Sequence, residues 1–175
     1  MNKLIKLTII FIALSVFSCK QNKNTSFNNS PVVITDDEIN YVNKEAVRKE
    51  RIQIDDFIRR YEWKMITTET GVSYWIYEKG NGAKTEKGNI VVLDYTITFL
   101  NGDTVYTSNI DGNKEFQLGK SNEVSGLEEA LLVMHQGDKA KVIVPSFRAY
   151  GITGDFNKIA MRNTLVYDIY ITKIY

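Results

Sequence analysis

The spacing of apolar side chains along the chain changes from helical to alternating near Trp63. Over residues 35–62 apolar positions recur at helical spacing around a charged middle, which predicts one amphipathic helix of about 25 residues or two shorter ones. Thr35 and Glu38 predict a capping box at its start, where acidic side chains also suit the helix dipole. Spacing alone does not choose between docking of this helix on the following domain and pairing with a second copy.

From Trp63 onward, alternation of apolar and polar residues predicts β-strands. The predicted strands cover residues 72–77, 91–99, 104–107, 115–118, 139–145 and 164–175. Asn101-Gly102 is a hairpin-turn signal between the second and third of these strands. The last strand is apolar on both faces, which is typical of a central, well-covered strand.

One short helix is predicted between the strands. Its apolar stripe consists of Leu127, Ala130, Leu131 and Met134. Ser125 and Glu128 predict a second capping box, Gly137 a C-cap, and His135 a carbonyl-capping side chain in the last turn. The fold class expected is α+β, a curled and mostly antiparallel sheet over one short helix, preceded by the N-terminal amphipathic helix.

The first residues carry a targeting pattern. Lys3 and Lys6 precede an apolar run over 7–17, too short to cross a bilayer comfortably, and this predicts a secretory signal. The sequence Val-Phe-Ser-Cys ending at Cys19 resembles a bacterial lipobox, in which the cysteine becomes the first mature residue and carries lipid. The alternative is an ordinary signal followed by a chance cysteine.

Four segments follow from these patterns. They are a lipoprotein signal peptide over 1–18, a flexible tether over 19–34, a helical segment over 35–62 and a globular domain over 63–175. Lipid on Cys19 would hold the protein at a membrane facing the periplasm, and the outer membrane is the expected location.

Composition excludes several functions. The chain has 22 basic and 21 acidic side chains, a formal net charge of +1, which gives no reason to expect nucleic acid as a partner. One Cys and one His exclude a disulfide framework, a thiolate metal cluster and a multi-His metal site. We therefore expect chemistry that needs neither a metal nor a cofactor.

Short motifs from residue 92 onward occur in a fixed order. They are VLDYT at 92–96, FQLG at 116–119, GLEEAL at 126–131, GDKA at 137–140, AYG at 149–151 and TLVYD at 164–168. This ordered set resembles the FK506-binding-protein (FKBP) type of peptidyl-prolyl cis-trans isomerase, across residues 70–175. Further stretches at 132–135, 147–151 and 154–159, together with the lipobox, are similar to the gliding-motility-associated isomerase lipoproteins of Bacteroidetes.

The resemblance implies rotation of X–Pro bonds in proline-containing polypeptides, and it assigns site residues position by position. Tyr95 and Tyr150 match pocket tyrosines, and Tyr150 would donate its hydroxyl to the substrate carbonyl. Val124 matches the apolar residue whose backbone N–H holds the ligand. Leu127 takes the floor position, where Trp is common but Leu also occurs.

The remaining matched positions form the wall and the rim. Tyr167 matches a wall Phe, and Ile159 matches an apolar residue on the loop over the site. Val105 stands where Phe is usual, and Tyr106 stands where an Asp ordinarily hydrogen-bonds within the site. All four are expected to contact substrate.

Two charged departures complicate the resemblance. Lys114 replaces a wall aromatic, and Asp155 stands where the loop often has a different polar residue. Charges at an apolar rim weaken binding unless they are solvated or paired, so we hypothesise that Lys114 and Asp155 pair across the rim. Weak activity toward small peptides and an altered sequence preference follow. The rival reading is a non-catalytic binding or scaffold lipoprotein that holds a motility or secretion component.

Overall fold

The computed structural model describes residues 36–175, except for the side chain of Glu38. The predicted signal peptide, the tether, Cys19 and the capping residue Thr35 lie outside the described residues. Among the residues that are described, no helix is both long and apolar enough to cross a membrane.

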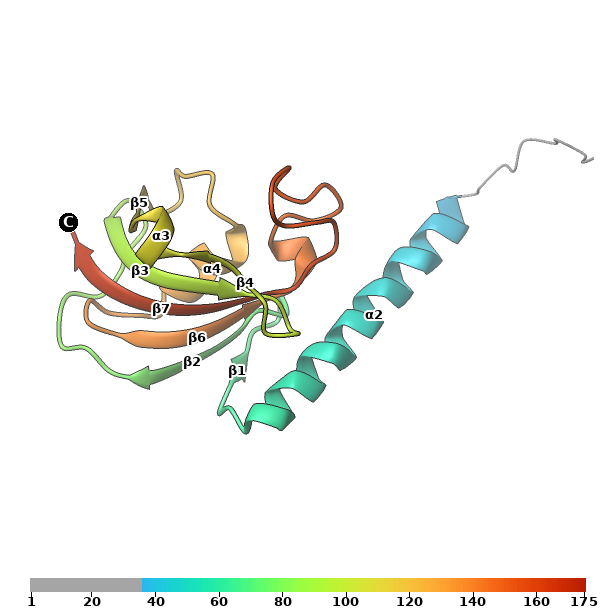
Figure 1. Ribbon diagram of the computed structural model, residues 1–175, viewed down its shortest axis with the longest axis horizontal. Helices are drawn as coiled ribbons and strands as arrows, with labels where there is room; N and C mark the ends of the chain where they lie inside the picture. Colours follow the sequence, from blue (N-terminus) through green and yellow to red (C-terminus); the bar gives the residue numbers. More distant parts are fainter. Residues whose placement is uncertain (1–35) are drawn as a thin grey trace, which may run out of the picture. The chain divides into compact units, whose positions relative to one another are not determined.

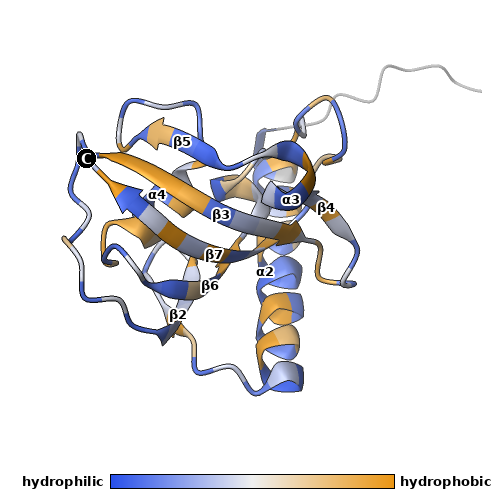
Figure 2. Cartoon of the chain, turned by 60° about the vertical axis from the view of Figure 1, so that its left-hand side comes forward, coloured by the Kyte–Doolittle hydropathy of each residue, from blue (hydrophilic) through white to orange (hydrophobic). Residues whose placement is uncertain are grey.

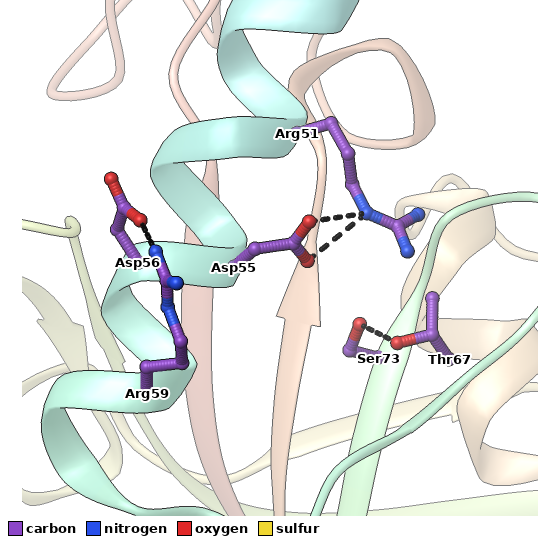
Figure 3. A network of polar contacts seen from close by, with 6 residues as sticks. All are labelled: Arg51, Asp55, Asp56, Arg59, Thr67 and Ser73. Atoms are coloured by element: carbon purple, nitrogen blue, oxygen red, sulfur yellow. Dashed lines mark hydrogen bonds and ion pairs between the residues drawn. The ribbon is translucent and has the colours of Figure 1, made fainter.

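A single long helix, α2 (Asp36–Tyr61), opens the described chain (Figure 1). The sequence left open whether this segment forms one helix or two, and it forms one. Side-chain ion pairs stabilise its exposed faces, among them Arg51 with Asp55 and Arg59 with Asp56. Both pairs lie within the helix, beside the first strands of the sheet (Figure 3).

One antiparallel sheet forms the rest of the domain. Its strands are β1 (Ile66–Thr67), β2 (Ser73–Glu78), β3 (Ile90–Thr98), β4 (Thr104–Thr107), β5 (Lys114–Gln117), β6 (Lys139–Val144) and β7 (Leu165–Ile174). Their order is β1-β2-β6-β7-β3-β4, and β5 pairs with β3 on the same edge as β4. Short helices connect the strands: α3 (Ser108–Asp111), α4 (Ser125–Leu131) and the 3₁₀-helix η1 (Ser146–Arg148). The predicted fold class is confirmed.

The strand β3 shows why the alternating pattern was informative. Val91, Leu93, Tyr95 and Ile97 are buried, whereas the residues that alternate with them, on the opposite face, are only partly buried. Figure 2 shows the hydrophobic residues along this strand. Because successive side chains in a strand point to opposite faces, one face of β3 builds the core.

The central strand β7 pairs with both β3 and β6, but only part of it is covered on both faces. Val166, at one end, is buried beneath α2, whereas Tyr170 on the same face is 37% exposed. The prediction that this strand is covered on both sides therefore holds only near its start. The reason is that α2 shields only that end of the outer face.

The short helix α4 buries the predicted stripe, since Leu127, Ala130 and Leu131 are all at most 1% exposed. Its predicted capping box is wrong. Val124 is the N-cap residue, and Ser125 Oγ donates to a backbone carbonyl of η1 instead. The Glu128 carboxylate accepts hydrogen bonds from the Ser121 hydroxyl and the Gly119 amide, because the preceding loop folds back over the helix start.

The predictions for His135 and Gly137 are also wrong. The helix α4 ends at Leu131, and His135 lies beyond it in an isolated β-bridge with Lys84. Gly137 has a φ of +94° in a turn closed by a hydrogen bond from the Asp138 amide to the His135 carbonyl. The buried Asp138 carboxylate orders this turn by accepting the His135 amide at 2.8 Å.

The helix α2 docks on the domain through its C-terminal half. Ile54 and Phe57 are 1% and 5% exposed and form a second apolar cluster with Ile143 of β6 and Val166 of β7. The apolar residues of the N-terminal half are different, since Ile39 and Val42 are about half exposed. Figure 2 shows hydrophobic residues on this helix. The amphipathic stripe is thus covered by the domain along only part of its length.

Replacing Ile54 by Ala should lower the free energy of unfolding by about 2–5 kcal/mol, because the change leaves a cavity between α2 and the sheet. Urea denaturation followed by tryptophan fluorescence measures the loss, since Trp63 packs against the same cluster. The matched control is Ile52→Ala, which makes the same change at a position of α2 that is 48% exposed and should change stability by about 0.5 kcal/mol at most. Equal losses in the two variants would contradict docking of the helix.

Candidate active site

The predicted site residues come together on the face of the sheet that packs against α4. Tyr95, Val105, Val124, Leu127, Ile159 and Tyr167 are buried members of one core cluster. Tyr106 and Tyr150 pack against this cluster and remain partly exposed. The same cluster forms the main core of the domain, so burial alone does not separate site from core. These two partly exposed tyrosines mark where the cluster reaches the surface.

The pairing of β3 with β7 places the two innermost tyrosines next to each other. Tyr95 lies opposite Ile169, and Tyr167 lies opposite Ile97, two residues along each strand. Residues in this diagonal relation share one face of an antiparallel pair and lie within reach of each other when aromatic. The two tyrosines therefore occupy adjacent positions on the face of the sheet that packs against α4.

The Tyr167 side chain is fully buried, and its hydroxyl has no hydrogen-bond partner among residues 36–175. Burial raises the pKa of this hydroxyl well above its ordinary value, with further contributions from the nearby Tyr150, Glu123 and Tyr95. Unpartnered buried hydroxyls are uncommon because they forfeit a hydrogen bond to water. Tyr167 thus keeps a proton available for donation.

Tyr150 follows η1 on the long connection between β6 and β7. Burial raises the pKa of its hydroxyl to about 12, and the negative charges of Glu123 and Asp155 add to this effect. The hydroxyl is therefore protonated over the whole neutral range and can serve as a hydrogen-bond donor.

The backbone around Val124 leaves one donor unused. Its carbonyl accepts hydrogen bonds from the amides of Leu127 and Glu128 at the start of α4. Its own amide donates to no backbone carbonyl within the described part of the chain. The first amides of a helix are commonly free to bind a ligand carbonyl or an anion. The predicted role of the Val124 N–H is compatible with this geometry.

Lys114 does not pair with Asp155, so that hypothesis is wrong. Its Nζ donates to Glu123 Oε1 at 2.5 Å, and the two side chains are 23% and 17% exposed. Lys114 Nζ also lies 5.4 Å from the centre of the Tyr95 ring. A partly buried ion pair, with Glu123 Oε2 left without a partner among residues 36–175, therefore stands in the wall where the resemblance implies an aromatic side chain.

Asp155 instead accepts a hydrogen bond from the Tyr106 hydroxyl, with 2.5 Å between Oη and Oδ2. Its other oxygen accepts the amides of Asn157 and Ile159. Burial acts to raise the pKa of the Asp155 carboxyl, but the hydrogen bonds from Tyr106 and these amides outweigh it and hold the pKa below its usual value. The family resemblance implies an Asp at position 106, where this chain has Tyr106. Asp155, on the connection between β6 and β7, thus supplies a carboxylate next to that position.

Ile159 reaches the core because the loop makes a tight reversal. Gly154 has a φ of +72°, and a Cβ placed there would lie 2.2 Å from the Ile159 carbonyl oxygen. The Asp155 amide donates to that same carbonyl. Only glycine fits such a position, and the reversal carries Ile159 over the cluster.

Sequence reasoning missed two charged residues that touch this site. Glu123 neutralises Lys114, and Lys158 lies with Nζ 4.6 Å from the centre of the Tyr106 ring while donating to the Val105 carbonyl. Glu123 directly precedes Val124, and Lys158 directly precedes Ile159. Being next to a predicted site residue was the only sequence signal for either, and it is a weak one. Their partners lie far away in sequence or across a turn, and only the folded loops reveal them.

No group of three or more His, Cys, Asp or Glu side chains arranged to hold a metal lies among residues 36–175. The candidate site is a set of converging apolar and phenolic side chains, in which Tyr106 and Tyr150 pack against the buried cluster. Such an arrangement offers apolar contacts and hydroxyl donors to a ligand.

Comparison with curated proteins finds bacterial relatives. The chain is 31% identical over 110 residues to the outer membrane protein MIP of Legionella longbeachae, covering 63% of this chain and 47% of that protein. It is 31% identical over 108 residues to the probable FKBP-type peptidyl-prolyl cis-trans isomerase FkpA of Neisseria meningitidis, covering 62% of this chain and 39% of the relative. The matched part therefore spans less than half the length of either protein.

Solved structures show the same fold. FkpA from Escherichia coli matches with a TM-score of 0.64 at 22% identity, covering 99% of this chain and 82% of that one. A peptidyl-prolyl cis-trans isomerase from Pseudomonas syringae matches with a TM-score of 0.64 at 23% identity, covering 75% of this chain and 94% of that one. The family model described as FKBP-type peptidyl-prolyl cis-trans isomerase matches residues 81–172, more than half of the chain. This chain belongs to the FKBP-type peptidyl-prolyl cis-trans isomerase family.

Proposed function

We propose that the protein catalyses cis-trans rotation of X–Pro bonds in exported polypeptides. Rotation about an amide bond has a barrier of about 18–20 kcal/mol, because planarity preserves the partial double bond. Unaided X–Pro bonds interconvert over tens to hundreds of seconds, slowly enough to limit folding. A site accelerates this step if it binds the twisted amide better than either planar form. No covalent bond breaks, so neither a nucleophile nor a metal takes part.

The convergence of Tyr95, Val124, Leu127 and Tyr150 within the family-matched region is the observation that carries this proposal. Twisting makes the imide nitrogen more amine-like and lowers the charge on the substrate carbonyl. An apolar floor with little water favours that less polar state. In our proposal the Tyr150 hydroxyl and the Val124 amide hold substrate carbonyls, and the buried side chains receive the proline ring.

A second candidate is a catalytically weak or inactive binding module. The specific observation in its favour is polar occupation of the rim, by the Lys114–Glu123 pair and by the Tyr106–Asp155 hydrogen bond. Both replace side chains that the family resemblance implies for substrate contact. Such a protein would use the same surface to hold a polypeptide without turning it over.

Catalysis of cis-to-trans exchange in a short X–Pro peptide, measured by NMR exchange at micromolar protein, separates these candidates. Tyr150→Phe should slow catalysis by about 10-fold, since one hydrogen bond to the reacting peptide contributes about 1.4 kcal/mol. Leu127→Ala should also slow it by removing the apolar floor. The matched control is Tyr170→Phe, on the outer face of β7, which should have wild-type activity.

Absence of any acceleration would reject the enzyme and leave the binding module. An active protein whose Tyr150→Phe and Leu127→Ala variants match the wild type would instead refute the assignment of the site.

Catalysis should not decline between about pH 7 and about pH 10, the range in which an ordinary tyrosine begins to ionise. The pKa of Tyr150 is raised to about 12, so its hydroxyl stays protonated throughout that range. In the unfolded chain Tyr150 ionises near the ordinary tyrosine pKa, whereas in the folded protein it stays protonated. Ionisation therefore favours the unfolded chain, and the contribution of Tyr150 to stability is lost as pH rises toward 12. Measuring the catalysed exchange rate as a function of pH checks this. The difference in ultraviolet absorbance between the wild type and Tyr150→Phe over the same pH range reports when the Tyr150 hydroxyl ionises. An activity loss centred near pH 10 would contradict it.

We further propose an envelope location, with lipid on Cys19 anchoring the protein to a membrane and the isomerase domain facing the periplasm. The lipobox sequence supports the anchor. The name of the Legionella relative places that protein in the outer membrane. The residues after Cys19 lack an acidic cluster of the kind associated with surface export in Bacteroidetes, which supports the periplasmic side. Similarity to gliding-motility isomerase lipoproteins supports a role in folding exported motility components.

Replacing Cys19 by Ser should move the protein from the membrane fraction to the soluble fraction of cells, because no lipid can be attached to the hydroxyl. Fractionation and immunoblotting measure the distribution, and Ser18→Ala is a control that keeps the small residue before the cysteine. An unchanged distribution of Cys19→Ser would refute lipid anchoring.

The N-terminal half of α2 supports one more proposal, that two copies pair through the segment 35–62. Ile39 and Val42 are about half exposed and lie on the stripe that the domain leaves uncovered. A second copy of the same helix would cover matching apolar positions.

A further inference from the structure

The helix α2 holds both ends of the connection that carries Tyr150. Glu50 Oε1 accepts hydrogen bonds from the Ser146 amide and the Thr164 hydroxyl, both at 2.6 Å. Glu50 Oε2 accepts the Ser146 hydroxyl at 2.9 Å. Ser146 begins this connection just after β6, and Thr164 ends it just before β7. One carboxylate thus joins the two ends.

Hydrogen bonds continue from Ser146 to the peptide units on either side of Tyr150. The Ser146 carbonyl accepts the Ala149 amide at 3.0 Å and the Gly151 amide at 2.8 Å. Glu50 thus holds the amide and the hydroxyl of the residue whose carbonyl makes these two bonds. A single residue, Ser146, links the α2 carboxylate to the peptide units that flank Tyr150.

A second tie joins the same two elements. The Arg162 amide donates to the Gly151 carbonyl at 2.8 Å, and Arg162 Nη2 donates to Asn43 Oδ1 at 3.1 Å. Asn43 and Glu50 are seven residues apart, so they lie on one face of the helix, about two turns from each other. Both polar contacts of α2 with the connection therefore come from the same helix face.

Apolar packing is weak where these ties are made. A cavity of about 350 Å³ lies between α2 and the connection, lined by residues that include Val47, Phe147 and Ile152. Val47, Phe147 and Ile152 are themselves 44%, 49% and 70% exposed. Since close packing does not hold the connection against the helix here, the hydrogen bonds of Glu50, together with the one between Arg162 and Asn43, hold it in place.

We propose that Glu50 is a positioning residue for Tyr150, so that docking of α2 sets the geometry of the isomerase site. This inference rests on the proposed isomerase function. Glu50 lies outside the region matched by the family model, residues 81–172, and it touches no residue assigned to substrate. It acts through Ser146 on the Tyr150 hydroxyl that faces the substrate carbonyl.

A double-mutant cycle tests the proposal with the full chain. Glu50→Ala should lower kcat on an X–Pro peptide by about 10-fold with little change in KM, because a small misplacement of a reacting group is costly. In the Tyr150→Phe background the same change should have no further effect, since residues that act through each other are not additive. Glu50→Gln keeps one acceptor oxygen, so its kcat should lie between those of the wild type and Glu50→Ala. If Glu50→Ala does not fold, Glu50→Gln takes its place in the cycle.

The matched control is Asp55→Ala. Asp55 accepts hydrogen bonds from Arg51 within α2, as Figure 3 shows. Its replacement by Ala should therefore leave kcat unchanged. An unchanged kcat in Glu50→Ala would overturn the proposal. So would an equal loss in the wild-type and Tyr150→Phe backgrounds, because a merely structural role of Glu50 gives that result.

Amide hydrogen exchange provides a readout that does not depend on activity. Glu50→Ala should speed exchange of the Ala149 and Gly151 amides by about 10-fold or more, while Asp55→Ala should not. Unchanged protection of these two amides would overturn the positional link. If the wild type shows no isomerase activity, the proposed function fails, and hydrogen exchange still decides whether Glu50 orders the segment around Tyr150.

Discussion

The pairing of β3 with β7 is the constraint on which the rest of this structure depends. The two strands pair along nearly their whole length, and each also pairs on its other edge with further strands. Their register brings Tyr95 and Tyr167 to adjacent positions on the face that covers α4. A slip of one residue would turn these side chains to the opposite face. Core and candidate site therefore depend on the same register.

The rim of the site combines apolar side chains with charged groups that each have an ion-pair or hydrogen-bond partner. Lys114 is paired with Glu123, and Asp155 accepts hydrogen bonds from Tyr106 and from two amides of its own loop. Unpaired charges in partly buried positions would be strongly unfavourable, so these pairings explain how the substitutions coexist with a folded site. They also distribute negative charge near the tyrosines, which contributes to keeping the hydroxyl of Tyr150 protonated.

The N-terminal helix α2 is held to the domain both by apolar packing and by hydrogen bonds. Ile54 and Phe57 extend the core across the outer face of the sheet, while Glu50 contacts the connection between β6 and β7. Apolar burial supplies non-directional stability, and hydrogen bonds supply direction. The two kinds of contact are separated along the helix, with hydrogen bonding toward its middle and apolar docking toward its C-terminal end.

The sequence by itself determined the longer elements, but not the short strand β1 or the short helices α3 and η1. Alternation placed β3 and β4 within a residue or two, and helical spacing identified the buried stripe of α4, because side-chain periodicity follows directly from backbone geometry. Ordered motifs were sufficient to identify the family, and they predict the tyrosines of the candidate site. These are local or collinear properties of the chain.

Only the tertiary structure decided the polar partners. Glu128 caps a loop rather than its own helix, Lys114 bonds to Glu123 rather than Asp155, and Glu50 reaches residues about a hundred positions away. Each of these carboxylates has several donors that sequence would allow. Hydrogen bonds and ion pairs act over a few ångströms, so the choice among partners follows from how loops fold back in space, which periodicity does not encode.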